Sequence, residues 1–243
     1  MAENKRPIVT GLCAFGMSGR MFQAPFLHAM DEFSLHAVVE RHAKRVANTY
    51  PDIRSYDSVE AMLADPAIEL VVVNTPNVEH FEHVRMALLA GKHVGVEKPF
   101  AVTSAQAAEM VELAARQDRK LVAFQNRRWD SDFLAVQQVV TEGLLGQLIE
   151  AEFHYDRYEK NLSAKAHKEV AQLGTGVIYD LGPHLIDQAI CLFGKPERVL
   201  AVLRTHRPGS AVNDYFDLTL LYGAFTVRLK SSLLALEPVP GFV

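Results

Sequence analysis

The pattern of hydrophobic and polar positions changes character about halfway along the chain. In the first half, short apolar runs rich in β-branched residues alternate with segments of helical periodicity. The apolar runs cover residues 8–14, 35–39, 70–73, 93–96 and 121–124, and the clearest helical patterns cover residues 80–90 and 105–115. Strands that are apolar throughout, with helices between them, predict a parallel sheet covered on both faces. We therefore predict a doubly wound α/β domain over residues 1–124.

The second half has a different pattern, in which several strands follow one another. Helical segments are expected at residues 132–141 and 181–193, and a partly alternating segment lies at residues 148–155. Three strand-like segments, VLAVLRTH, DYFDLTLLY and FTVRLKSSLLAL, then succeed one another without a helix between them. Consecutive strands with short links predict an open, mostly antiparallel sheet with a helix on one face. Residues 125–243 are thus predicted to form a second, α+β domain.

Composition and charge indicate which kinds of molecule the protein is expected to bind. The 243 residues carry a formal net charge of -4, and no basic cluster is longer than Arg127 and Arg128. Nucleic acid is therefore not expected as a main partner. No apolar run approaches the roughly 18 residues of a membrane span, and the N-terminus lacks the apolar stretch of a signal peptide. These features predict a cytoplasmic protein without a membrane partner.

Cysteine and histidine spacing gives no indication of a metal site. Cys13 and Cys191 lie far apart among apolar neighbours, so we expect two buried, reduced thiols and no disulfide. His80 and His83, with two neighbouring glutamates, imitate the spacing of metal ligands on a helix. No third ligand cluster accompanies them, and acidic residues are common in the first turn of a helix. We therefore expect no bound metal.

The stretch GLCAFGMSGR, residues 11–20, ends the first apolar run and opens a helical segment. It fits the dinucleotide fingerprint G-x-G-x-x-G if Gly16 and Gly19 take its last two positions and Ala14 the first. Gly16 would let the backbone approach a pyrophosphate, and Gly19 would let the helix pack closely on the sheet. Alanine is tolerated at the first position where φ is negative. We interpret the stretch as a cofactor loop, and a purely structural turn is the alternative.

Polar residues at the ends of the next strands extend this interpretation. In VVERH, Glu40 stands about 20 positions after the loop, where an acidic residue binds the ribose 2'-hydroxyl of NAD. Arg41 could instead meet the 2'-phosphate of NADP, and both could be solvated charges, so these alternatives stay open. Asn74 and Thr75 follow the apolar run LVVV. They are expected at the carboxyl edge of the sheet, where such folds bind ligands.

Two further motifs carry groups suited to acid–base chemistry. The segment GVEKPF places Lys98 at a strand end, and Pro99 keeps it out of helical geometry, so its ammonium group could polarise a substrate oxygen. A solvated lysine is the alternative. In YDLGPHLIDQAI, Asp180 and His184 stand four residues apart near a helix start, as a carboxylate that orients a base should. An N-cap aspartate and a surface histidine are the alternative. The predicted apolar face of this helix comprises Leu181, Leu185, Ile186, Ala189, Ile190 and Phe193, opposite Asp180, His184, Asp187 and Gln188.

These motifs, in this order, resemble the Gfo/Idh/MocA family of NAD(P)-dependent oxidoreductases. The strongest marks are EKP after the fourth long apolar run and the D-x-x-x-H of Asp180 and His184. FQNRRWDSDF and YDLGPHLIDQAI look like a branch that contains NADP-dependent scyllo-inositol dehydrogenases. The resemblance implies a Rossmann dinucleotide-binding domain and a substrate domain whose open sheet often forms dimer contacts, and hence a homo-oligomer. It also implies a cis peptide bond between Lys98 and Pro99.

The resemblance further implies hydride transfer between NAD or NADP and a secondary alcohol or carbonyl of a sugar, cyclitol or related polyol. Lys98, Asp180 and His184 would line the reacting carbon, with His184 as general base, Asp180 as its orienting group and Lys98 stabilising charge on the oxygen. Arg128 and Trp129 would border the substrate. The residues expected to bind the cofactor are Ala14, Phe15, Gly16, Met17, Ser18, Gly19, Glu40, Arg41, Asn74, Thr75, Pro76, Asn77, His80, Glu97, Lys98 and Asn126.

Two departures from the family pattern affect these expectations. Glu40 stands where NADP-preferring relatives of this branch tend to carry a small residue, so the sequence leaves NAD and NADP both open. The family's chains run on beyond this length, and we expect this chain to lack a C-terminal part of the substrate domain. The principal alternative to an enzyme is a non-catalytic NAD(P)-binding sensor or regulatory protein. A purely structural α/β protein would bind no cofactor.

Overall fold

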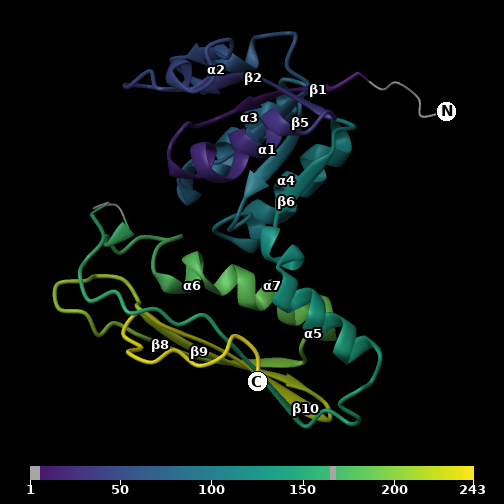
Figure 1. Ribbon diagram of the computed structural model, residues 1–243, viewed down its shortest axis with the longest axis vertical. Helices are drawn as coiled ribbons and strands as arrows, with labels where there is room; N and C mark the ends of the chain where they lie inside the picture. Colours follow the sequence, from purple (N-terminus) through teal and green to yellow (C-terminus); the bar gives the residue numbers. More distant parts are fainter. Residues whose placement is uncertain (1–5, 165–167) are drawn as a thin grey trace. The chain divides into compact units, whose positions relative to one another are not determined.

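The computed structural model describes residues 6–164 and 168–243, which form two compact units (Figure 1). One unit ends at Phe124 and the other begins at Gln125. Each unit has its own sheet and its own hydrophobic core.

A six-stranded parallel sheet forms the first unit. Its strands are β1 (Ile8–Leu12), β2 (Phe33–Val39), β3 (Arg54–Tyr56), β4 (Leu70–Val73), β5 (His93–Glu97) and β6 (Leu121–Phe124), in the order β3-β2-β1-β4-β5-β6. Every pair of neighbouring strands is parallel, which confirms the predicted doubly wound sheet. The chain builds β2 and β3 on one side of β1 and then returns to the other side for β4. Such a reversal of strand order is where sheets of this kind bind ligands.

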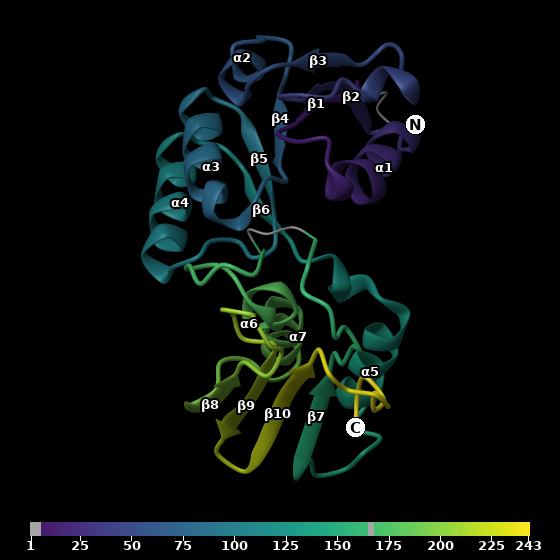
Figure 2. The same cartoon turned by 90° about the vertical axis from the view of Figure 1, so that its left-hand side faces the viewer.

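Helices cover both faces of this sheet. Figure 2 shows α3 (His80–Leu89) and α4 (Ser104–Arg116) on one face and α1 (Ala24–Ala29) on the other. The shorter helices are η1 (Gly19–Gln23), η2 (Val46–Asn48), α2 (Val59–Leu63) and η3 (Asn77–Glu79). α4 begins where Thr103 Oγ1 accepts a hydrogen bond from Gln106 N (3.1 Å), which satisfies one of the free N–H groups of the first turn.

A four-stranded mixed sheet forms the second unit. Its strands are β7 (Glu150–His154), β8 (Arg198–Arg204), β9 (Tyr215–Tyr222) and β10 (Phe225–Ser232), in the order β7-β10-β9-β8. The strands β8, β9 and β10 are antiparallel neighbours, whereas β7 pairs with β10 in parallel. The predicted mostly antiparallel sheet is thus confirmed. The helices of this unit are η4 (Asn126–Trp129), α5 (Ser131–Thr141), α6 (Val177–Asp180) and α7 (Gly182–Phe193).

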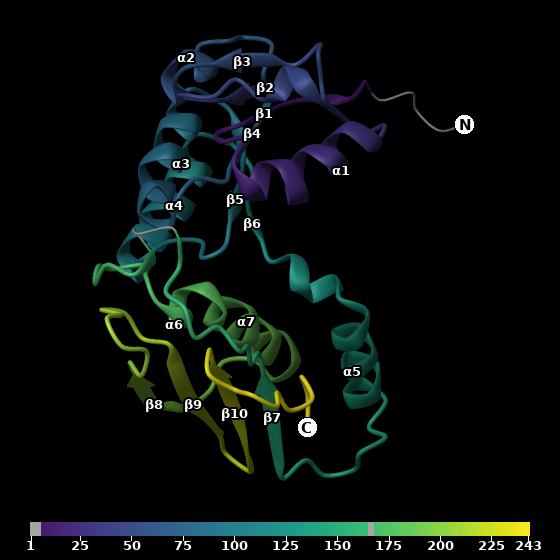
Figure 3. The same cartoon turned by 60° about the vertical axis from the view of Figure 1, so that its left-hand side comes forward.

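One face of the second sheet is packed and the other is open. Phe216, Leu218 and Leu220 of β9 are buried in the core that also contains Leu185 and Ala189 of α7, and Figure 3 shows α7 lying along the sheet. The alternate positions of β9 point to the other face, because successive side chains of a strand point in opposite directions. The sequence DYFDLTLLY therefore encodes both a packed and an exposed surface.

The two cysteines lie in different environments. Cys13 is buried directly after β1, and burial raises the pKa of its thiol above the ordinary value, as expected of an inert core thiol. Cys191 is exposed, so its predicted burial is wrong. It lies one helical turn after Asp187 on α7, whereas Leu185 and Ala189 are the residues of that helix that enter the core.

Asp65 ties the end of α2 to the edge of the first sheet. Its buried carboxylate accepts hydrogen bonds from Ala67 N (2.9 Å) and Tyr56 Oη (2.8 Å). Arg54 Nη1 donates to the same carboxylate (3.2 Å), and His36 Nε2 lies 3.1 Å from it. The hydrogen bonds from the backbone of Ala67 and the hydroxyl of Tyr56 are the main reason that the pKa of Asp65 falls to about 2.

We expect Asp65→Asn to lower the free energy of unfolding by about 2 kcal/mol at pH 7, because an amide cannot accept all these hydrogen bonds. The folded pKa of about 2 lies below that of an unfolded aspartate. The stabilisation is therefore complete above about pH 4 and is lost as the pH falls through about 2. Urea unfolding at pH 7 and pH 3 measures the change.

Asp57→Asn is the matched control for this experiment, because the Asp57 side chain is 87% exposed. Its effect is expected to stay within about 0.5 kcal/mol. A deficit of Asp65→Asn that is the same at pH 3 as at pH 7 would contradict the assignment of this carboxylate.

Candidate active site

The loop after β1 is held by the side chain of Asn74, which follows β4. Asn74 Oδ1 accepts a hydrogen bond from Ala14 N (2.9 Å), and Asn74 Nδ2 donates one to Ala14 O (2.8 Å). The pair continues the contact between β1 and β4 beyond the end of the sheet. Within the loop, Phe15 packs in the core beneath α1 and Met17 is exposed. The loop thus lies at the reversal of strand order, where a ligand site is expected.

Glu97, the last residue of β5, holds the far part of the same loop. Its Oε1 accepts hydrogen bonds from Ser18 Oγ (2.7 Å) and Gln23 Nε2 (2.8 Å). Three residues predicted to bind a cofactor, Ser18, Asn74 and Glu97, are therefore brought together around one loop. Gln23 was not predicted. Its signal in the sequence is that of a single polar side chain in the apolar run MFQAPF.

The two glycines of the loop have opposite surroundings. A Cβ atom added at Gly19 would overlap the carbonyl oxygen of Ala14 and lie 2.9 Å from Asn74 Nδ2, so this position is closed to other residues. A Cβ added at Gly16 would meet nothing within 4 Å. Gly19 thus allows the backbone to pack on itself, whereas Gly16 lies beside open space.

Glu40 and Arg41 occupy different environments although they are neighbours after β2. The buried carboxylate of Glu40 accepts hydrogen bonds from Arg45 N (2.7 Å), Val46 N (3.3 Å) and Ser55 Oγ (2.9 Å). The Arg41 side chain is 52% exposed, and its guanidinium group lies 3.5 Å from the Glu79 carboxylate. The acidic side chain is engaged in shaping its own loop, and the basic one faces solvent.

The residues that follow β4 form a short polar network. Thr75 Oγ1 lies 3.0 Å from His83 Nδ1, and Pro76 and Asn77 lead into η3 and α3. Burial lowers the pKa of His83 in spite of the nearby Glu79. The neutral imidazole that results is suited to a hydrogen bond with the hydroxyl of Thr75.

His80 joins the ends of β4 and β5. Its Nδ1 lies 2.8 Å from Pro99 O and its Nε2 lies 3.0 Å from Thr75 O. The ring is buried, and this burial lowers its pKa, although the two carbonyl contacts act in the opposite direction. The peptide bond between Lys98 and Pro99 is cis, as the resemblance implies. His80 therefore braces the backbone beside Lys98, which is itself half-buried.

Asp180 and His184 lie on two short helices that meet. Asp180 is the last residue of α6, and α7 begins at Gly182 with Pro183 in its first turn. Proline has no backbone N–H to continue the hydrogen bonds of α6, so the helix is interrupted there. His184 is buried rather than on a surface, and Gln188 is buried as well, whereas Ile190 is 45% exposed. The predicted polar and apolar faces of this helix are wrong at these positions.

The sequence reasoning missed two residues, Tyr155 next to His184 and Arg127 next to Tyr155. The rings of Tyr155 and His184 have centroids 6.2 Å apart at 61°. The guanidinium carbon of Arg127 lies 4.8 Å from the centroid of the Tyr155 ring, and Arg127 Nη1 donates to Asp130 Oδ2 (2.8 Å). Burial raises the pKa of Tyr155, and the positive charge of Arg127 opposes this. A signal for Arg127 was present, since it is the first of the two arginines in FQNRRW.

The second arginine of that motif has a structural contact. Arg128 donates two hydrogen bonds to the Asp187 carboxylate, from Nη2 (2.6 Å) and Nε (2.7 Å), and so attaches η4 to α7. Trp129 is 76% exposed, and Asn126 opens η4. The predicted roles of these residues toward substrate and cofactor stay predictions.

Within residues 6–164 and 168–243, no group of three or more His, Cys, Asp or Glu side chains is arranged to hold a metal ion. In the same two ranges, no helix has both the length and the apolar character needed to span a membrane.

Both halves of the chain match models of known protein families. Residues 8–125 match the oxidoreductase family with an NAD-binding Rossmann fold, and residues 133–239 match the GFO/IDH/MocA C-terminal domain. The two matches follow one another in the order that the sequence motifs predict.

Individual relatives agree with these matches. The chain is 43% identical over 225 residues to an uncharacterized oxidoreductase of Schizosaccharomyces pombe, covering 90% of this chain and 61% of that protein. It is 37% identical over 216 residues to the NADP(+)-dependent scyllo-inositol 2-dehydrogenase of Bacillus subtilis, covering 89% of this chain and 60% of that enzyme. A solved oxidoreductase structure from Bacillus subtilis superposes with a TM-score of 0.93 at 34% identity, over 99% of this chain and 69% of that one. The chain thus spans about 60% of the length of these two curated relatives.

The contrast between the two glycines gives a testable prediction. We expect Gly19→Ala to lower the free energy of unfolding by about 2 kcal/mol, because its Cβ would collide with backbone that cannot move aside. Gly16→Val should leave stability within about 0.5 kcal/mol of the parent, yet weaken binding of a nicotinamide dinucleotide, since its side chain would fill the open space. Urea unfolding and titration calorimetry with NADPH measure the two effects. Unchanged NADPH affinity in Gly16→Val would identify the loop as a structural turn.

Proposed function

The chain belongs to the GFO/IDH/MocA oxidoreductase family, and on that premise we propose the reaction that the whole protein catalyses. It moves a hydride between the nicotinamide of NAD(P) and a secondary alcohol or carbonyl carbon of a sugar, cyclitol or related polyol. The bound nicotinamide supplies or accepts the hydride. The relative whose name states a cyclitol substrate, scyllo-inositol 2-dehydrogenase, supports this substrate class.

The observation that carries the proposal is the pair of side chains that hold the glycine loop. Asn74 and Glu97 come from the ends of two neighbouring strands and bind the loop at Ala14 and Ser18, and of the two glycines Gly16 lies beside open space and Gly19 does not. Binding a pyrophosphate requires backbone that approaches it closely at a helix start. A structural turn has no need of an open position there.

The proposed acid–base chemistry uses three residues of this chain. In alcohol oxidation, the imidazole of His184 accepts the hydroxyl proton as a hydride leaves the carbon that bears this hydroxyl. The alcohol thus loses two electrons and two protons, one proton within the hydride and the other to His184. The Asp180 carboxylate orients that imidazole and balances its positive charge. The Lys98 ammonium group donates a hydrogen bond to the oxygen as the carbonyl forms. In the reverse direction His184 returns the proton.

Arg127 is proposed as a further contact to the polyol. Its guanidinium group is fixed by Asp130 and by the ring of Tyr155, and Tyr155 in turn contacts the ring of His184. A fixed fork of donors, held on the ring that contacts the base, is suited to hold hydroxyl groups that flank the reacting carbon. Arg128, which is already bound to Asp187 on both oxygens, is less available for that role.

We propose NADP as the preferred cofactor, with Arg41 bound to its 2'-phosphate. The carboxylate that would bind the ribose of NAD belongs to Glu40, and three hydrogen bonds hold it inside its own loop. The exposed Arg41 guanidinium stands next to it at the end of β2. The name of the Bacillus subtilis relative, which specifies NADP(+), agrees with this choice.

The working form of the protein is proposed to be a homo-oligomer in the cytoplasm. The open face of the second sheet supports this proposal, because β9 and β10 present alternate side chains that the core of the unit leaves uncovered. Among them, Arg228 and Asp217 form an ion pair (Nη2–Oδ2 2.6 Å).

We expect His184→Ala and Lys98→Met each to reduce turnover of accepted polyols by about 100-fold or more, because general acid–base groups contribute at least that much. Steady-state rates of NADP reduction over a panel of polyols measure this. Lys195→Met, at an exposed position, is the control and should keep the parent rate. Unchanged turnover in both variants would contradict the assignment. Cofactor binding by the parent without turnover of any polyol would favour the sensor or regulatory alternative.

The cofactor proposal predicts that Arg41→Ala raises the dissociation constant of NADPH about tenfold, since a charge-assisted contact to the 2'-phosphate is lost. The dissociation constant of NADH should not change. Titration calorimetry with both nucleotides measures this. Glu40→Gln should lower stability without improving NADPH binding, because the amide breaks the loop's hydrogen bonds. Equal affinity of the parent for NADH and NADPH would contradict the preference.

A further inference from the structure

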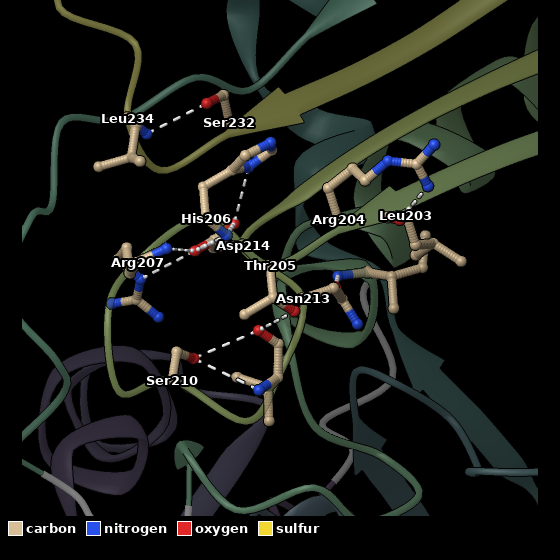
Figure 4. Close-up of polar contacts among 12 residues, drawn as sticks. Leu203, Arg204, Thr205, His206, Arg207, Ser210, Asn213, Asp214, Ser232 and Leu234 are labelled. Atoms are coloured by element: carbon tan, nitrogen blue, oxygen red, sulfur yellow. Dashed lines mark hydrogen bonds and ion pairs between the residues drawn. The ribbon is translucent and has the colours of Figure 1, made fainter.

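The loop between β8 and β9, residues 205–214, is built around the buried carboxylate of Asp214 (Figure 4). The Asp214 side chain has no exposed area. Its oxygens accept hydrogen bonds from His206 N (2.8 Å) and Arg207 N (2.7 Å), and His206 Nδ1 lies 3.2 Å from Oδ1. The buried carboxylate of Asp214 therefore fixes the loop backbone through these hydrogen bonds.

Arg207 connects this loop to the long polar segment that precedes α6. Its side chain is 4% exposed; Nη1 donates to Asn161 O (2.9 Å), and Nη2 lies 3.1 Å from both carboxylate oxygens of Glu169. The Glu169 carboxylate also accepts hydrogen bonds from Ser163 N (2.8 Å) and Ser210 Oγ (2.8 Å). Removing such charges from water is costly, and Arg207 Nη2, Ser163 N and Ser210 Oγ together hold the Glu169 carboxylate in place.

The same loop fixes the start of α6. Asn213 O accepts a hydrogen bond from Val177 N (2.9 Å), and Asn213 Oδ1 accepts one from Ile178 N (3.0 Å). Gly176 precedes them with a φ of +89°, and a Cβ there would lie 2.5 Å from Asn213 Nδ2. Only glycine suits this position, and the register of α6 up to its last residue, Asp180, is set by the loop.

Lys168 and Asp180 are thus both positioned by the loop at residues 205–214. Lys168 is the residue before Glu169, and its Nζ lies 3.7 Å from Asp180 Oδ2. Both side chains are partly exposed, at 45% and 42%. An exposed ion pair is ordinarily weak, because two long side chains must lose freedom to form it. Here the backbone at both ends is already fixed, so part of that loss has occurred before the pair forms.

We propose that Lys168 is a positioning residue of the active site, whose ammonium group holds the Asp180 carboxylate in the orientation that His184 requires. The inference rests on the proposed function, since it assigns to Asp180 the task of orienting the base. Lys168 acts through Asp180 and does not itself touch the reacting carbon. The ion pair of Arg207 and Glu169 is the anchor that places it.

Carboxyl footprinting tests the contact without relying on turnover. In this experiment a carbodiimide and glycine ethyl ester label exposed carboxylates, and peptide mass spectrometry reports the labelling rate of Asp180. We expect Lys168→Met to raise that rate about threefold, since the ion pair no longer protects the carboxylate. Lys168→Arg should restore the parent rate. Lys160→Met is the matched control, because Lys160 lies in the same segment with its ammonium group over the Tyr158 ring (5.2 Å).

Steady-state kinetics test whether loss of the ion pair between Lys168 and Asp180 slows the reaction. Lys168→Met should lower kcat about fivefold, leave the KM for the polyol and the dissociation constant of NADPH unchanged, and leave the unfolding midpoint unchanged. Lys168→Arg should recover kcat. Glu169→Gln should show the same loss, and combining it with Lys168→Met should add little, because both act through one contact.

The outcomes separate the inference from the function on which it rests. An Asp180 labelling rate that does not change in Lys168→Met overturns the inference, and so does an unchanged kcat in an active protein. Equal losses of kcat in Lys168→Met and Lys160→Met overturn it too. Such losses would follow from any substitution in this segment and not from the ion pair with Asp180. A parent protein that binds no nicotinamide dinucleotide, or turns over no polyol, overturns the proposed function and the catalytic role of Lys168 with it, whatever the footprint.

Discussion

The first unit depends on the two hydrogen bonds between the side chain of Asn74 and the backbone of Ala14. They join the chain two residues beyond the last paired positions of β1 and β4, at the point where the strand order reverses. The close approach of Gly19 to Ala14 O follows from this arrangement, because the loop is drawn against β4 and must fold back over its own carbonyl. Glu97 then holds Ser18 and Gln23 from the next strand. With the loop bound on both sides, the open space at Gly16 is a defined feature and not a result of loose packing.

Carboxylates with little or no exposed surface fix the shape of loops elsewhere in the chain. Glu40, Asp65, Glu169 and Asp214 each accept at least one backbone N–H, and each holds a connection between regular elements in a fixed shape. A carboxylate can do this because its two oxygens accept several hydrogen bonds at once. Burying the charge costs free energy because the carboxylate leaves water. Hydrogen bonds at nearly all of its acceptor positions are needed to offset that cost.

In the second unit, an interrupted helix brings polar groups together. Pro183 ends the hydrogen bonding of α6 and lets α7 begin at Gly182, so that His184 is buried against Tyr155. The sequence predicts His184 and Gln188 on the polar face of this helix. In the structure His184 and Gln188 are buried together with their sequence neighbours Leu185 and Ala189, which pack in the core. The polar residues of this segment are therefore part of the interior.

The sequence by itself determined the two kinds of sheet, because continuous and alternating apolar runs record which strand faces are covered. It also determined the order of the motifs at the strand ends, since parallel strands bring their carboxyl ends to one edge. The short β3 (Arg54–Tyr56) and the parallel pairing of β7 with β10 escaped prediction, because neither depends on a local apolar pattern. Only the tertiary structure decided that Glu40 points into its own loop and Arg41 outward, and that Arg127 rather than Arg128 stacks on Tyr155. Adjacent charged residues have the same local polar signal, and what separates them is the partner that folding places within reach of each side chain.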